Sequence, residues 1–128
     1  MSSRLVVAAV VAVLTVAGWL LIFPSDWSSV ATADPDTLAS PVTGAHWALL
    51  AVLLGVLGLT AGLAGHPWVP VLAAGIPALV LYCIQAGSAE VVGANLWVIG
   101  AGVLAVALAG GLIVAGWAGY VLRRRLPG

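Results

Sequence analysis

The stretch from residue 96 to residue 122 reads LWVIGAGVLAVALAGGLIVAGWAGYVL and holds no charged side chain. A helix needs about 20 apolar residues to cross the roughly 30 Å hydrocarbon core of a bilayer. This stretch is longer than that, so a helix here must tilt or extend beyond the hydrocarbon. The stretch therefore predicts a membrane-spanning helix.

Three further apolar runs precede it, at about residues 5–23, 47–64 and 68–86. They are too long for ordinary strands and lack the alternating pattern of membrane barrels. A helix satisfies all of its backbone polar groups internally, as lipid demands. We therefore expect an all-α membrane protein, a four-transmembrane-helix bundle. It forms a single integral membrane domain over residues 1–128, with a long first external loop at residues 24–45.

The composition excludes several other classes of protein. Hydrophobic residues make up 63% of the chain and charged residues only 6%, against roughly 25% charged in soluble domains. Disorder requires low hydrophobicity and high charge, so this composition excludes it. Nucleic-acid binding requires a basic patch, which this chain lacks. The single cysteine excludes an internal disulfide framework and a cysteine-based zinc cluster. We expect membrane lipid as a partner and no nucleic acid.

The arginines predict the orientation of the bundle. Arg4 precedes the first run, and Arg123, Arg124 and Arg125 follow the fourth. Four helices return both termini to the same side, and positive residues favour the cytoplasmic side. These arginines are therefore predicted topology anchors, with the N-terminus and the C-terminus cytoplasmic. The aromatic residues fall near the expected membrane boundaries, where amphipathic rings are enriched.

The first loop leaves one alternative open. Residues Ala31-Thr32-Ala33 have the small-x-small form of a signal-peptide cleavage site, and cleavage there would leave three helices. The apolar run before it exceeds the usual 7–15 residues of a signal peptide, so we favour a retained helix. Asp34 followed by Pro35 also favours a short helix in this loop, which Pro41 would end.

Pro77 lies inside the third run. Proline removes one backbone hydrogen bond and clashes with the preceding turn. We therefore expect a kink in the third helix.

Small residues recur at intervals of four in two of the runs. In lipid the hydrophobic effect does not drive helices together, so small side chains favour association by letting backbones approach closely. The predicted helix-packing residues are Gly58, Gly62, Ala107, Gly111, Ala115 and Gly119. Their contacts are expected within the bundle, with a face reserved for another subunit as the alternative.

The apolar runs carry little chemistry. Their polar residues are Thr15, Thr60, Cys83 and Gln85, and none of them is a carboxylate or a base. An intramembrane ionisable group would mark a proton or ion pathway. No nucleophile, base and orienting acid can be assembled from the sequence. We expect no catalytic residue, no cofactor and no enzymatic activity.

Polar residues outside the runs form a candidate outer cluster, which comprises Asp26, Asp34, Asp36, His46 and Glu90. Histidine and carboxylates together can bind Zn²⁺. Their spacing matches no ligand motif, so a metal or haem site at the outer face is only a remote alternative and we expect none. His66 is most simply interpreted as a turn residue.

Together these features favour a small non-enzymatic multi-pass protein, a structural or accessory subunit that packs against a larger membrane complex. Its expected partners are other membrane protein subunits or further copies in a homo-oligomer. The alternative is a homo-oligomeric pore or permeation protein of the holin-like class, with which it loosely shares small size and a basic tail. Abundant Ala, Gly and Val with no Lys suggest a GC-rich genome and a bacterial cytoplasmic membrane.

Overall fold

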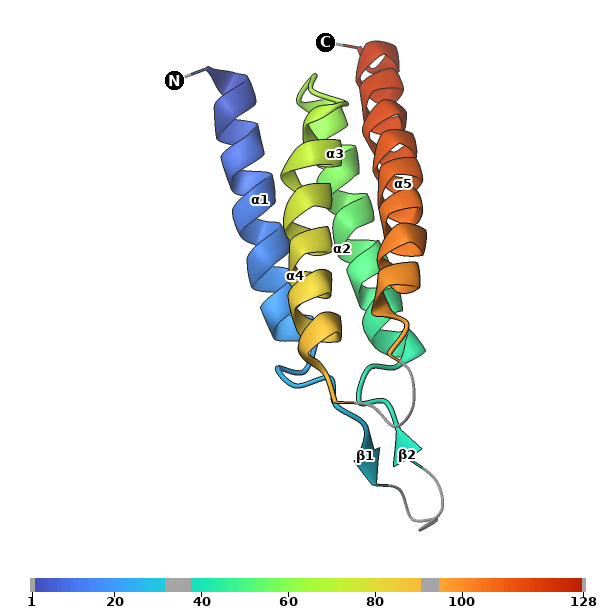
Figure 1. The fold of residues 1–128 in the computed structure, drawn as a ribbon. Coiled ribbons are helices and arrows are strands. Elements are labelled where there is room, and N and C mark those ends of the chain that lie inside the picture. The colour runs from blue at the N-terminus through green and yellow to red at the C-terminus, as the bar shows by residue number, and fades with distance from the viewer. Residues whose placement is uncertain (1, 32–37, 91–94, 128) are drawn as a thin grey trace.

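The chain folds into a bundle of long helices in a computed structural model that describes residues 2–31, 38–90 and 95–127. Figure 1 shows the helices side by side, with both termini at one end and the small strand pair at the other. We name these ends the terminal end and the loop end. The helices are α1 (Ser3–Ile22), α2 (Gly44–Leu63), α3 (Val69–Ala73), α4 (Gly75–Ser88) and α5 (Trp97–Arg125).

Among the described residues, four helices are long and apolar enough to span a membrane. They are α1, α2, the α3–α4 pair and α5, and they confirm the predicted number of helices. Many large apolar side chains point away from the bundle; Leu21 is 87% exposed and Val106 is 75% exposed. A water-soluble monomer rarely exposes contiguous apolar surface on this scale. The chain therefore has the fold and surface of a membrane protein.

Both terminal helices extend further than predicted. The hydroxyl oxygen of Ser2 accepts the N–H of Leu5 at 3.3 Å and caps α1, so Arg4 lies within the first turn of that helix. At the other terminus α5 continues through Arg125 instead of ending at residue 122. Cations in a last turn interact favourably with the helix dipole, so the helix does not need apolar residues there.

The third span is broken into α3 and α4 at Ala74. The break lies before Pro77 because a proline ring clashes with the carbonyl four residues earlier, here that of Ala73. Helical hydrogen bonds continue on either side, from Ala74 N–H to Pro70 O at 2.9 Å and from Ala78 N–H to Ala74 O at 3.1 Å. The third helix is therefore interrupted one turn before the proline.

The first loop forms a short antiparallel strand pair, β1 (Val30–Ala31) and β2 (Leu38–Ala39). Val30 lies opposite Ala39. The predicted loop helix therefore does not reach residues 38–39, because these are extended and pair with β1. Its expected start at Asp34 lies outside the described residues, as do two residues of the candidate cleavage site, Thr32 and Ala33.

Candidate functional site: a groove between α2 and α5

The terminal half of the α2–α5 pair is packed through its backbones. A side chain at Gly62 would collide with the backbone of Gly116, and one at Gly119 would collide with the carbonyl of Leu59. Gly58 faces Ala115, whose methyl group would lie 2.8 Å from a β-carbon at residue 58. Helices can approach this closely only where one of them has no side chain.

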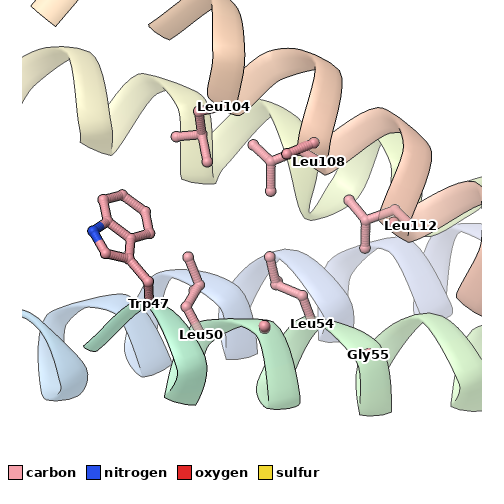
Figure 2. A pocket seen from close by; sticks show the side chains of 10 residues that line it. Trp47, Leu50, Leu54, Gly55, Leu104, Leu108 and Leu112 are labelled. Carbon is pink, nitrogen blue, oxygen red and sulfur yellow. The ribbon is translucent and has the colours of Figure 1, made fainter. Parts of the chain in front are cut away.

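The loop half of the same pair opens into a groove of about 260 Å³. Figure 2 shows Trp47, Leu50 and Leu54 of α2 facing leucines of α5 across it. Leu50 and Leu112 are almost fully buried and form part of its floor. We name this space the α2–α5 groove, and its lining residues are Trp47, Leu50, Ala51, Leu54, Gly55, Leu104, Ala107, Leu108, Gly111 and Leu112.

Small residues line the groove without contacting a neighbour. A β-carbon built at Gly55 or Gly111 meets no other atom within 4 Å, and Ala51 and Ala107 are exposed. The lining carries no charged or nucleophilic side chain, and its polar side-chain group is the indole N–H of Trp47. The groove therefore suits an apolar segment and offers no group for catalysis.

The structure divides the predicted helix-packing residues into two sets. Gly58, Gly62, Ala115 and Gly119 lie at the α2–α5 interface. Ala107 and Gly111 lie in the groove instead. Gly116 is a packing residue that was not predicted. It is buried, its backbone faces Gly62, and a side chain there would collide with the carbonyl of Pro67. A signal for it was present, since it lies three residues before Gly119.

An aromatic cluster closes the loop end of the bundle. Trp47 belongs to both the groove and this cluster, and Trp19 is fully buried inside it. The ring centroids of Trp19 and Phe23 are 4.4 Å apart, and those of Trp27 and Tyr82 are 5.7 Å apart. The sequence placed these rings near a membrane boundary; the structure shows that they pack on one another. We name Trp19, Phe23, Trp27, Trp47 and Tyr82 the aromatic cluster.

Gln85 joins the aromatic cluster to the chain around it. The indole N–H of Trp19 donates to its side-chain oxygen at 2.5 Å, and its amide group donates to the carbonyl of Pro24 at 3.4 Å. These bonds connect α4 to α1 and to the start of the first loop. They also explain why a glutamine can stand in an apolar helix, because both of its polar atoms are satisfied.

Asp26 and Glu90 join the connections between helices, Asp26 through its carboxylate and Glu90 through its backbone. The carboxylate of Asp26 accepts the backbone N–H of Ser28 at 2.9 Å. This backbone bond, together with hydrogen bonding by the Ser28 hydroxyl, lowers the pKa of Asp26 below its ordinary value. The backbone of Glu90 accepts the N–H of Ser29 at 2.9 Å and donates to the Ser28 hydroxyl at 2.8 Å. The first loop is thereby joined to the segment that follows α4.

His46 acts as a helix-capping residue. The backbone N–H of Thr43 donates to its Nδ1 at 2.8 Å, and its ring stacks on Phe23 with centroids 5.8 Å apart. Asp34 and Asp36 lie outside the described residues. Among the residues that are described, no three His, Cys, Asp or Glu side chains gather closely enough to hold a metal ion.

The four arginines lie at the terminal end. Arg4 lines a second cleft there. The guanidinium of Arg123 lies over Gly65 at the turn between α2 and α3, where a side chain would collide with it. Arg124 stands 5.4 Å from the ring centre of Tyr120, a cation–π distance.

Comparison with known proteins gives no relative from which a function could be transferred. No protein-family model matches the chain, and no similar curated protein or solved structure was found. The residues and geometry of the chain itself therefore carry the functional argument.

Proposed function

We propose that this protein is a non-enzymatic accessory subunit that binds one transmembrane helix of a larger membrane complex in the α2–α5 groove. The observation that carries the proposal is the exposure of Ala107 and Gly111. These two residues continue the row that Ala115 and Gly119 begin, yet the chain's own helices do not cover them.

The shape of the groove favours a helix as its occupant. In lipid, helix association depends on close van der Waals packing, and small residues permit it. Gly55 on α2 and Gly111 on α5 leave open space on both sides of the groove, so an approaching helix meets no large side chain at either rim. Trp47 and the leucines of the floor offer it apolar contact.

We place the protein in a bacterial cytoplasmic membrane with both termini in the cytoplasm. Arg4 and the three arginines at the end of α5 support this orientation, because positive residues favour the cytoplasmic side. We also propose that α1 is retained in the mature protein. Trp19 of α1 is fully buried and bonded to Gln85, so removal of α1 would take away the centre of the aromatic cluster.

The experiment compares substitutions inside and beside the groove. Tagged Gly111→Leu and Ala107→Leu are extracted gently from native membranes, and the native mass and co-purifying proteins are measured. Gly110→Leu is the matched control, because Gly110 is an adjacent exposed glycine with open space around it and does not line the groove. We expect a stoichiometric partner to be lost from the two groove variants and kept by the control.

Two outcomes would overturn the proposal. Association that is unchanged in all three variants would exclude the groove as the binding surface. A homo-oligomer as the sole complex would replace the accessory subunit with the pore alternative, in which a second copy fills the groove. Leak of solute from loaded vesicles would then measure whether that homo-oligomer conducts. Thermal unfolding in detergent checks that each variant keeps its fold.

A further inference from the structure

A second cleft opens at the terminal end of the bundle, opposite the aromatic cluster. Its volume is about 470 Å³, within the range of known small-molecule sites. The residues around it come from α1, the α2–α3 turn, α3 and α5. They include Arg4, His66, Trp68, Leu72, Trp117 and Tyr120.

Two walls of the cleft are aromatic and apolar. Trp68 and Trp117 meet edge to face with centroids 5.8 Å apart. Trp68 is 58% exposed and Leu72 is 65% exposed, so this side of the cleft is open to the surroundings of the bundle. Tryptophan is enriched where lipid headgroups meet hydrocarbon. An acyl chain and its glycerol group could therefore lie against these residues.

The other wall is positive. Arg4 lines the cleft beside His66, whose Nε2 lies 3.1 Å from the hydroxyl of Ser3. Tyr120 also lines the cleft, and it holds the guanidinium of Arg124 over its ring. One guanidinium group, that of Arg4, therefore lines the cleft, and a second lies beside Tyr120, one of its lining residues. Arginine is well suited to bind phosphate oxygens in pairs.

The distribution of charge selects an anion. All four arginines lie at the terminal end, while the described carboxylates, Asp26 and Glu90, lie in the connections at the loop end. No described carboxylate therefore competes with an anion for Arg4 at the cleft. An occupant that is negative at one end and apolar at the other satisfies both walls.

We propose that this cleft binds an anionic phospholipid, with its phosphate at Arg4 and its apolar part against Trp68 and Leu72. The site rests on the proposed insertion of the bundle in a membrane, but it does not depend on the α2–α5 groove or on a protein partner. It would place a bound lipid at the end of the bundle that carries both termini.

The test measures lipid retention by the purified full-length chain in detergent. Delipidated protein is mixed with equimolar phosphatidylglycerol and phosphatidylcholine, and the lipid adducts are counted by native mass spectrometry. We expect phosphatidylglycerol to be retained preferentially. Arg4→Gln should reduce its retention by about tenfold or more, because hydrogen bonds to charged groups are strong. Trp68→Leu should also weaken retention, because the ring and its polar N–H are lost.

Arg125→Gln is the matched control, because it removes the same charge from the same end without lining the cleft. General attraction between an arginine and an anionic lipid accounts for a loss of about fivefold. Equal losses in Arg4→Gln and Arg125→Gln would overturn the site, and so would equal retention of the two lipids by the wild type. Displacement by millimolar inorganic phosphate would identify a simple anion site and overturn the lipid proposal.

Discussion

The two halves of the α2–α5 pair use small residues in opposite ways. In the terminal half, Gly62 and Gly119 bring the helices into backbone contact. In the loop half, Gly55 and Gly111 line an open groove. The difference arises from the large side chains between the helices. In the loop half, leucines stand between α2 and α5, namely Leu50, Leu54, Leu108 and Leu112. In the terminal half, glycines leave that space to the two backbones. A small residue permits close packing, but the residues around it decide whether packing occurs.

The loop half is held together by other means. Trp19 is buried, and its ring meets those of Trp27 in the first loop and Trp47 in α2. Its indole N–H is bonded to Gln85 of α4. The terminal half therefore depends on close backbone contact, while the loop half depends on aromatic packing and polar bonds. Gly55 and Gly111 take no part in either kind of contact, because a β-carbon built at each of them meets no other atom within 4 Å.

The largest effect is expected from a methyl group in the terminal half. Gly62→Ala and Gly119→Ala each place a β-carbon against the backbone of the facing helix. The helices must separate, and overpacking of this kind costs about 1–3 kcal/mol. We expect a marked fall in the thermal unfolding temperature of the purified protein in detergent.

Gly111→Ala provides the control from the loop half. Its new β-carbon has open space, and alanine is favoured over glycine in a helix by about 1 kcal/mol. We expect its unfolding temperature to be unchanged or higher. Equal destabilisation by all three substitutions would mean that the two halves are packed alike, and the comparison would fail.

A smaller effect is expected from the polar bond of the loop half. Gln85→Leu removes the acceptor of the Trp19 indole N–H. Hydrogen bonds between membrane helices contribute about 0.6 kcal/mol on average and up to about 1.7 kcal/mol, so we expect a loss of about 1 kcal/mol. A double-mutant cycle with Trp19→Phe isolates this bond, and a coupling energy near zero would show that aromatic packing alone holds this half.

The sequence predicts the helices well because their signal is local. Hydropathy over about 20 residues is sufficient to locate a membrane-spanning helix, and Pro77 explains the break between α3 and α4 through its own ring. The division of the small residues could not be predicted in this way. Ala107 and Gly111 have the same spacing as Ala115 and Gly119, and only the position of α2 distinguishes the two pairs.

The contacts of the aromatic cluster were also beyond the sequence. Trp19 and Gln85 are 66 positions apart, and neither residue indicates the other. The boundary preference of tryptophan gave no information about which rings would meet. The position of His46 near the start of a helix was a local signal, and its capping bond to Thr43 agrees with it.

The smallest effect is expected from the loop that covers the aromatic cluster, and it depends on pH. Ser28 holds the pKa of Asp26 below its ordinary value of about 4. A carboxyl group whose pKa is lowered by folding stabilises the folded state above its unfolded pKa, and this contribution is lost as the pH falls through the folded pKa.

Ser28 also bonds to Glu90, so protonation of Asp26 loosens the link between the two connections. We expect the unfolding temperature to fall slightly more steeply below about pH 4 in the wild type than in Asp26→Asn. Parallel pH profiles would show that this link adds nothing to the loop half, whose stability would then come from the aromatic cluster and Gln85.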